Sequence, residues 1–222
     1  MIAMQLKRYG YLMIIIPLLM ACSKPSAREI LLNPEHPEWT KTAPEEFGAI
    51  VTTSKGDFKL RIVRSWAPIG ADRFYNLARF GYYDDSRFYR VVKGFIVQFG
   101  LARDPQITEK WLDQTIGDDP VKASNTRGRL AFAFTDPGTR STQVYISTVD
   151  NIRLDSIGFA PFGEVIEGMD IVDKIYSVYG ENAGGGVRRG NQKFIIEEGN
   201  THLDEEFPKL DKLLKIEIVE VL

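Results

Sequence analysis

The sequence predicts a mostly β protein, a closed antiparallel β-barrel capped by two α-helices, one at each end. Two observations lead to this fold class. Many short runs of β-branched and aromatic residues are separated by turn residues, whereas only two segments carry apolar residues at helical spacing. The 222 residues contain no visible internal repeat, and their number suits one domain with a tail.

The first two strands are expected at residues 49–53 and 58–63. Turn-forming residues 54–57 lie between them, so the sequence predicts a hairpin. Apolar and charged residues alternate within the second run, which indicates a half-buried strand. Further strands are expected within residues 88–99, 130–134, 144–148, 163–165 and 215–221.

Two segments predict helices. Residues 68–81 place Phe74 and Leu77 on one face at helical spacing, and Gly81 supplies a stop. Residues 168–179 show the same spacing of apolar side chains. These two helices are the ones expected to cover the ends of the barrel.

The N-terminus has the form of a secretory signal. A short positive region precedes an apolar run, residues 11–21, which is shorter than the roughly 20 residues that span a bilayer. The run ends at Cys22, the only cysteine of the chain, and this count excludes a disulfide scaffold. Residues 19–22 resemble a bacterial lipoprotein signal, and the resemblance implies cleavage before Cys22 and attachment of lipid to it.

This interpretation divides the chain into three parts. Residues 1–21 are the expected signal peptide, residues 22–46 a lipidated cysteine with a tether, and residues 47–222 the compact domain. Prolines among polar residues predict an extended or disordered tether, although Trp39 could dock on the domain. The protein is therefore expected outside the cytoplasm, on the periplasmic side, held to a membrane by lipid, with the outer membrane as the candidate.

Several function classes lack support in the sequence. The formal net charge is −2, so no basic excess indicates binding to nucleic acid. The histidines, His36 and His202, have no ligand residues beside them at metal spacing, and no nucleophile elbow is present. The carboxylate pairs at residues 84–85 and 118–119 are interpreted as solvated turns, and the glycine-rich residues 184–190 as a flexible loop. We expect neither a metal nor a cofactor.

The stretch of residues 88–98 carries the most informative side chains. If residues 88–92 form a strand, Arg90 shares a face with Phe88 and Val92, and a guanidinium there needs a partner or a ligand. An outward arginine on a strand face is the alternative, and this stretch by itself leaves the choice open.

Three ordered blocks resemble the cyclophilin-type peptidyl-prolyl cis-trans isomerases. They are FYRV with GFIVQ in residues 88–98, GRLAFA with STQVYIS in residues 128–147, and LD, FGEV and EGMDIV in residues 154–172. Several blocks in one order are far more specific than any single block, and the resemblance extends over nearly all of the compact domain. It implies a cyclophilin-like barrel and an enzyme that isomerises Xaa-Pro bonds.

The resemblance assigns a role to each matching position. It implies that Arg90 is the catalytic residue. It implies a proline pocket lined by Phe95, Ile96, Tyr145 and Leu154, and a substrate backbone held by Gln98, Ala133 and Gln143. For Ile96 and Leu154, ordinary core packing is the competing interpretation.

Arginine suits this chemistry. Amide resonance sets a barrier of about 18–20 kcal/mol to rotation of the peptide bond. In the twisted state the prolyl nitrogen gains a lone pair, and a fixed guanidinium N–H bonded to it favours that state over the planar one. The expected partners are proline-containing segments of exported proteins, and the enzyme is expected to act as a monomer.

Several positions depart from the family pattern, including Tyr145 at a phenylalanine and Phe99 in place of the first glycine of a pair. Tyr89 stands at a usual histidine, Phe134 at an asparagine and Arg153 at a tryptophan, while Phe159 lies where a further histidine is missing. This altered wall leaves an alternative open, a chaperone or assembly module that binds proline segments with little or no turnover. A structural lipoprotein with a vestigial pocket is the third interpretation.

Overall fold

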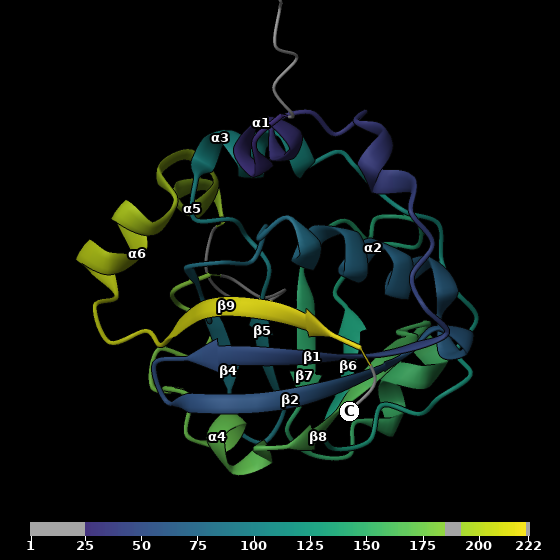
Figure 1. Cartoon of the computed structure of the whole chain (residues 1–222). Helices are drawn as coiled ribbons and strands as arrows, with labels where there is room; N and C mark the ends of the chain where they lie inside the picture. Colours follow the sequence, from purple (N-terminus) through teal and green to yellow (C-terminus); the bar gives the residue numbers. More distant parts are fainter. Residues whose placement is uncertain (1–24, 185–191, 221–222) are drawn as a thin grey trace, which may run out of the picture.

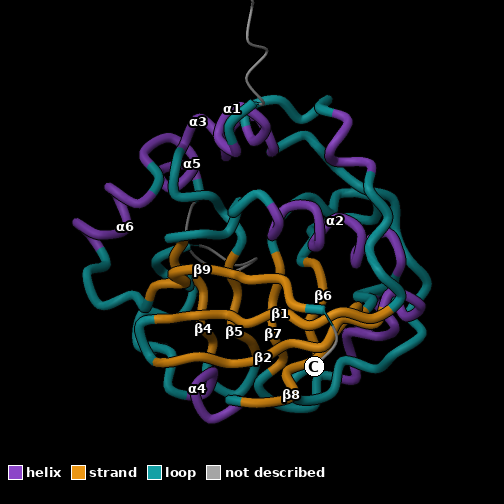
Figure 2. The backbone as a smooth tube through the Cα atoms, in the orientation of Figure 1, coloured by secondary structure: helices purple, strands orange, loops and turns teal. Residues whose placement is uncertain are grey.

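The computed structural model describes residues 25–184 and 192–220, which form one antiparallel sheet with helices around it (Figures 1 and 2). The predicted signal peptide and Cys22 lie outside the described residues. The strands are β1 Glu46–Thr53, β2 Gly56–Val63, β3 Ser86–Arg87, β4 Arg90–Val92, β5 Ile96–Phe99, β6 Arg129–Phe132, β7 Val144–Ser147, β8 Pro161–Glu167 and β9 Lys212–Val219.

The nine-stranded sheet is strongly curled, and its hydrogen-bonded order is β3-β9-β1-β2-β8-β6-β7-β5-β4. Every pairing in it is antiparallel, which confirms the mostly β, antiparallel part of the prediction. The order has two ends, β3 and β4. These two strands are consecutive in the chain and are separated only by Phe88 and Tyr89. The structure is thus a curled sheet whose two end strands are neighbours in the sequence.

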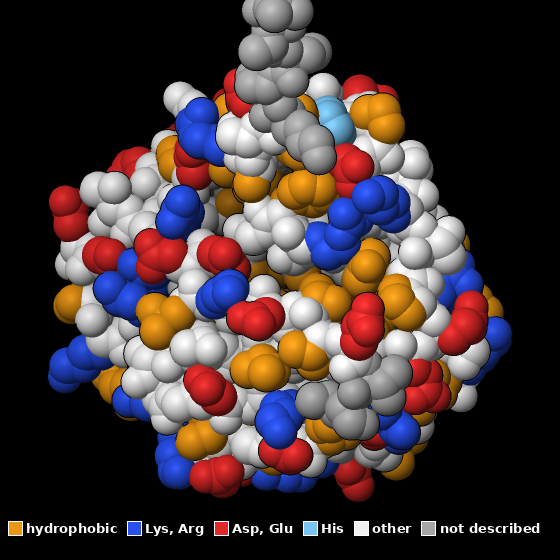
Figure 3. Space-filling view, in the orientation of Figure 1, with side chains coloured by type: hydrophobic (Ala, Val, Ile, Leu, Met, Phe, Trp, Pro, Cys, Tyr) orange, Lys and Arg blue, Asp and Glu red, His pale blue; other side chains and the backbone are white. Residues whose placement is uncertain are grey.

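The core lies inside the curl, as the alternation of β2 predicts. Phe58, Leu60 and Ile62 have no exposed surface, whereas Arg61 between them is exposed. Figure 3 shows the outer face above β9, β1 and β2, where basic and acidic side chains are interspersed. The ion pair between Lys59 on β2 and Glu167 on β8, with 2.9 Å between Nζ and Oε2, belongs to this outer surface.

Six α-helices and three 3₁₀ segments surround the sheet within the described residues. They are α1 Ala27–Leu31, η1 Pro37–Thr40, η2 Arg64–Trp66, α2 Pro68–Arg79, α3 Pro105–Trp111, η3 Ile152–Ile157, α4 Met169–Asp173, α5 Lys193–Glu198 and α6 Asn200–Glu206. Figure 1 shows α2 above and α4 below the curled sheet. The prediction of a helix at residues 68–81 is confirmed, whereas α1, α3, α5 and α6 were not expected. None of the helices among these residues has the length and apolar character of a membrane span.

The helix expected at residues 168–179 is much shorter than predicted. It begins after Gly168, which has a positive φ of 79°, and it ends at Asp173. Beyond it the N–H of Tyr176 donates to a carboxylate oxygen of Asp211 at 2.7 Å. In a longer helix, this N–H would have donated to a carbonyl of the preceding turn. The apolar spacing therefore predicted a helix longer than the one in the structure.

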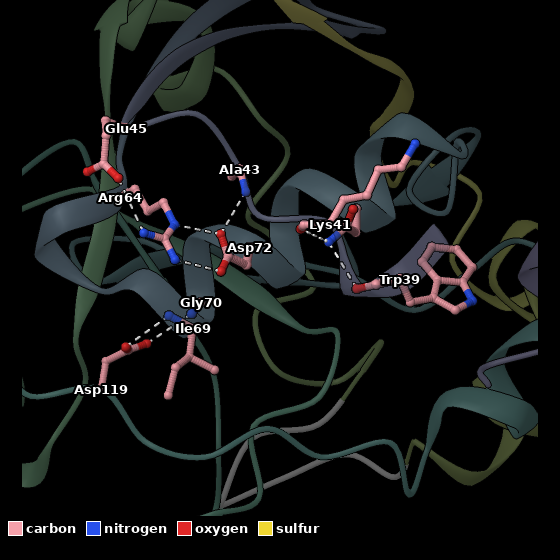
Figure 4. Close-up of polar contacts among 10 residues, drawn as sticks. Trp39, Lys41, Ala43, Glu45, Arg64, Ile69, Gly70, Asp72 and Asp119 are labelled. Atoms are coloured by element: carbon pink, nitrogen blue, oxygen red, sulfur yellow. Dashed lines mark hydrogen bonds and ion pairs between the residues drawn. The ribbon is translucent and has the colours of Figure 1, made fainter. Parts of the chain in front are cut away.

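The N-terminus of α2 is held by a buried carboxylate from another part of the chain. Its N-cap residue, Ala67, offers no side-chain acceptor to the free N–H groups of the first turn. Asp119 accepts instead from the N–H groups of Ile69 and Gly70, at 3.0 and 2.9 Å (Figure 4). The same carboxylate pairs with Arg140 at 3.0 Å, and both side chains are at most 2% exposed. The solvated turn predicted at residues 118–119 is therefore wrong for Asp119.

The described part of the predicted tether is packed against the domain. Ile30 and Leu31 of α1 are buried, and the carbonyl of Leu31 accepts from the indole N–H of Trp111 at 2.8 Å. The ring of Trp39 meets Phe80 and Trp111 edge to face, with centroids 5.1 and 4.8 Å apart. Disorder is thus wrong for residues 25–45, because their apolar side chains pack on the domain, whereas the docking that the sequence allowed for Trp39 is confirmed.

Backbone contacts fix the same segment to α2. The amide of Asn76 donates to the carbonyl groups of Trp39 and Lys41, at 3.0 and 2.7 Å. The N–H of Ala43 donates to Asp72 at 2.8 Å, and Asp72 also receives the guanidinium of Arg64 (Figure 4). These bonds join the N-terminal segment to the face of α2 that lies outside the sheet.

Replacing Trp39 with alanine is expected to destabilise the domain by about 2 kcal/mol, because a half-buried tryptophan contributes part of the 3–5 kcal/mol that a fully buried one does. Chemical denaturation monitored by circular dichroism measures this change. The matched control is Glu35→Ala, an exposed side chain in the same segment, for which we expect a change within about 0.5 kcal/mol. Equal stability of the two variants would mean that the segment is not docked in solution.

Candidate active site

Arg90 lies on β4, directly opposite Gln98 on β5. Its guanidinium donates to Gln98 Oε1 through Nη1 at 2.9 Å, and to Glu181 Oε1 through Nη2 and Nε at 2.5 and 3.1 Å. Its side chain is 13% exposed. A solvated outward arginine is therefore excluded for this position. Of the five N–H donors of an arginine, these bonds use three, and the other two have no partner among residues 25–184 and 192–220.

Gln98 continues a row of polar side chains into the protein. Its Nε2 donates to Gln143 Oε1 at 3.0 Å and to the hydroxyl of Tyr89 at 3.2 Å. The hydroxyl of Tyr89 in turn donates to Gln143 at 2.5 Å. Burial raises the pKa of Tyr89, so its phenol remains a neutral donor at physiological pH. The row fixes the amide of Gln98, which in turn fixes the guanidinium of Arg90.

The predicted pocket residues form a cluster of their own, separate from the main core. Its buried members are Ile96, Ala131, Tyr145 and Leu154, and its half-buried members are Phe95, Ala133 and Phe159. All the residues expected to line the pocket meet here, together with Ala133 from the backbone-binding set. The half-buried members form the part of this cluster that a ligand can reach, and it lies beside Arg90, whose guanidinium carbon is 5.8 Å from the Phe95 ring centroid.

Asn125 is hydrogen-bonded to two members of this cluster, Tyr145 and Phe159. No pattern in the sequence indicated this role. Its Oδ1 accepts from the hydroxyl of Tyr145 at 2.6 Å, and its Nδ2 donates to Asp155 at 2.7 Å and to the carbonyl of Phe159 at 2.8 Å. The side chain is fully buried. Asn151 adds a bond from its Nδ2 to the carbonyl of Phe95 at 2.9 Å. Both asparagines lie in loops without hydrophobic periodicity, where no pattern in one sequence identifies them.

Asn125→Ala is expected to lower the free energy of unfolding by about 3 kcal/mol. It leaves the buried hydroxyl of Tyr145, the carboxylate of Asp155 and the carbonyl of Phe159 without this hydrogen-bond partner. It is also expected to lower kcat/KM by roughly 10-fold or more, because the apolar cluster loses its support. Thermal unfolding and an isomerisation assay measure the two effects. In a Tyr145→Phe background the stability cost should shrink, since no hydroxyl is then left unpaired. An unchanged cost in that background would contradict the assigned contact.

Two side chains from the C-terminal part of the chain reach into the same row. Glu181 binds Arg90, as described above, and Gln192 exchanges two amide hydrogen bonds with Gln143, each 3.1 Å long. Nearby, Ala183 packs with Tyr89 in a second small apolar cluster that includes residues of α5 and α6. The sequence offered no signal for Glu181 or Gln192, because neither belongs to the blocks around Arg90 and Gln143.

The arrangement combines an oriented guanidinium, a row of amides and an adjoining apolar surface. Within the described ranges, no three or more His, Cys, Asp or Glu side chains are grouped so as to hold a metal ion. The chemistry that these side chains can supply is therefore recognition of an apolar ring beside a polar backbone, with a charged donor next to both. The row contains two groups with acid–base character: the carboxylate of Glu181 is bonded to Arg90, and burial keeps the phenol of Tyr89 neutral by raising its pKa.

Comparison with known proteins places most of the domain in one family. The sequence model of the family "Cyclophilin type peptidyl-prolyl cis-trans isomerase/CLD" matches residues 49–198. The chain is 33% identical over 147 residues to peptidyl-prolyl cis-trans isomerase A of Dickeya dadantii. The match covers 61% of this chain and 74% of that protein. It is 34% identical over 135 residues to peptidyl-prolyl cis-trans isomerase B of Escherichia coli, 57% of this chain and 82% of that protein.

Solved structures show the same fold. A cyclophilin type peptidyl-prolyl cis-trans isomerase of Cryptosporidium parvum superposes with a TM-score of 0.58 at 22% identity, covering 80% of this chain and 99% of that one. A structure of that protein in the presence of the dipeptide Ala-Pro superposes with a TM-score of 0.57, covering 78% and 99%.

Proposed function

This chain belongs to the cyclophilin-type peptidyl-prolyl cis-trans isomerases, and from that premise we propose that it accelerates Xaa-Pro isomerisation during the folding of exported proteins. The single observation that carries the proposal is Arg90, whose guanidinium is fixed by Gln98 and Glu181 beside an apolar cluster. Among the described residues, two of its five N–H donors have no hydrogen-bond partner. Proline-containing segments are the ligands that fit such a site.

The reaction needs no covalent step. The prolyl ring would pack on the half-buried face of the cluster, which Phe95, Ala133 and Phe159 form. One free N–H of Arg90 would bond to the prolyl nitrogen as the bond twists, because only in the twisted state does that nitrogen carry a lone pair. Such a bond lowers the energy of the twisted state and not of the planar one, which is what acceleration requires. Gln98, Ala133 and Gln143 would hold the neighbouring backbone, the role that the family resemblance implies for them.

The experiment that tests this function measures exchange between cis and trans forms of a short Xaa-Pro peptide by NMR, with and without the protein. Uncatalysed exchange takes tens to hundreds of seconds, so catalysis appears as exchange on a much shorter timescale. We expect clear acceleration by substoichiometric protein. A folded protein that leaves the exchange rate unchanged would refute the catalytic role.

One observation favours a second candidate, a module that binds proline segments with little turnover. Two groups expected to contact substrate already have protein partners: Glu181 takes two of the N–H donors of Arg90, and Gln192 pairs with the amide of Gln143. A substrate has to compete with these side chains. If peptides bind without accelerated exchange, the binding module is the correct function. If no proline peptide binds, the structural lipoprotein remains.

We further propose that Cys22 carries lipid and holds the protein on the periplasmic side of a membrane, with the outer membrane as the candidate. The support is the form of the first residues, together with the position of the cysteine. Only three residues separate Cys22 from Ser26, the N-cap of α1. At about 3.3–3.6 Å per residue, the four steps from Cys22 to Ser26 reach at most roughly 14 Å, so the domain would sit close to the lipid surface. Mass spectrometry of the mature protein tests the anchor; an unmodified Cys22 would rule it out.

Two structural expectations accompany this function. We propose that the enzyme acts as a monomer, which sedimentation would test against a dimer. We also propose that residues 86–92 close the sheet into a barrel, because β3 pairs with β9 and β4 with β5 across a short break. The N–H of Phe88, bonded to the carbonyl of Asp211 at 3.1 Å, should then exchange slowly with solvent. Fast exchange there would count against closure.

A further inference from the structure

Two guanidinium groups lie near the ring of Phe95. The Cζ atom of Arg153 is 4.8 Å from the ring centroid, and that of Arg90 is 5.8 Å from it. Arg153 belongs to η3, whose next residue is the buried Leu154 of the apolar cluster. The backbone therefore holds Arg153 at the rim of the surface on which a prolyl ring would pack.

The charges of these two arginines differ in how they are balanced. Arg90 is paired with Glu181 and is nearly buried. Arg153 is exposed, and in the described parts of the chain no carboxylate forms an ion pair with it. The positive charge of Arg153 therefore has no carboxylate partner among the described residues. Its guanidinium lies over the ring of Phe95.

Acidic residues near Arg153 in sequence are engaged elsewhere. Both carboxylate oxygens of Asp155 accept hydrogen bonds from Ser124 and Asn125. Burial raises the pKa of Asp155, but these hydrogen bonds outweigh it and lower the pKa, so the carboxylate is charged and committed to them. Asp150 accepts from the N–H of Arg127. Neither therefore supplies a partner for the guanidinium of Arg153.

We propose that Arg153 determines specificity, and that the site prefers proline segments with an acidic side chain next to the proline. This inference rests on the proposed function and names the substrate class of the same site. With its ring on the apolar cluster, a bound proline has neighbouring residues that pass the rim. A carboxylate there would meet an unpaired guanidinium, whereas an ammonium group would meet a like charge.

The expected size of the preference follows from exposure. An exposed ion pair contributes little, so the ratio between an acidic and a basic peptide should be about 2–5-fold in kcat/KM. The preference should weaken in high salt, because the Debye length falls to about 3 Å at 1 M. The competing interpretation is that Arg153 merely covers Phe95, in which case peptide charge has no effect that depends on this residue.

The experiment uses three peptides that differ only in the residue before proline: Glu, Gln or Lys. We would compare kcat/KM for the full chain and for Arg153→Glu, at low salt and at about 1 M salt. Intrinsic differences between the peptides cancel, because the quantity of interest is the change in the Glu-to-Lys ratio between the two proteins. Lys110→Glu on α3 is the matched control, since it makes the same change in net charge at another exposed cation.

We expect the ratio to favour Glu in the full chain, to fall about 5-fold or more in Arg153→Glu, and to stay unchanged in Lys110→Glu. Equal ratios in the full chain and Arg153→Glu would overturn the proposal while leaving the isomerase activity established. If no peptide is isomerised, the catalytic function fails instead, and dissociation constants for the same peptides then decide the preference. Arg153→Gln should give an intermediate ratio; a value outside the two extremes would also contradict the proposal.

Discussion

Arg90→Ala is expected to lower kcat/KM for Xaa-Pro isomerisation by about 10²–10³-fold, by analogy with the loss found when one donor of an oxyanion hole is removed. The loss follows from geometry. The guanidinium is held on two edges by Gln98 and Glu181, so its remaining donors point in fixed directions. Without it, the peptide can still pack on the apolar cluster, so the effect should fall on kcat more than on KM.

Arg90→Lys separates charge from shape. Lysine keeps the positive charge but lacks the planar guanidinium that donates to Gln98 and Glu181 at the same time. We therefore expect Arg90→Lys to recover only a small part of the activity. Arg61→Ala, on the outer face of β2, is the control for loss of an arginine and should retain full activity. Circular dichroism confirms folding of each variant. Full activity of a folded Arg90→Ala would refute its assignment as the catalytic residue.

Asp119→Ala is expected to destabilise the domain by about 3–5 kcal/mol, because it leaves the buried guanidinium of Arg140 without its closest carboxylate. It also removes the acceptor for the N–H groups of Ile69 and Gly70 at the start of α2. For a domain of this size each kcal/mol shifts Tm by about 2–4 °C, so a fall of roughly 6–20 °C should be visible in thermal unfolding.

Two further variants identify the cause. Asp113→Ala, an exposed aspartate in the same part of the chain, should leave Tm within a few degrees. Arg140→Met in the Asp119→Ala background should restore part of the lost stability, because no unpaired charge is then buried. A drop below about 1 kcal/mol for Asp119→Ala would mean that this ion pair does not hold α2.

The sequence alone was sufficient for the parts that depend on local pattern. The alternation of Phe58, Leu60 and Ile62 predicted strand β2 and its buried face, and the spacing around Phe74 predicted helix α2. The ordered blocks identified the family, and with it the set of residues that meet around Arg90. These features are readable because each rests on neighbours a few residues apart, or on an order of residues that one chain displays.

Tertiary structure decided the features that rest on contacts between distant residues. Helix α4 ends early because Asp211 takes a backbone donor at Tyr176, and the N-terminal segment docks because Trp39 finds Trp111. Asp119 is buried because Arg140 and α2 meet there, although its sequence resembles a solvated turn.

The site shows the same division. Sequence determined that Arg90, Gln98 and Gln143 belong together. Only the fold brought Glu181 to the guanidinium and left Arg153 unpaired at the rim. The physical reason is that the energy of a buried or paired charge depends on the groups that surround it in space. Local periodicity does not indicate a partner that lies some ninety residues away in sequence, as Glu181 does from Arg90.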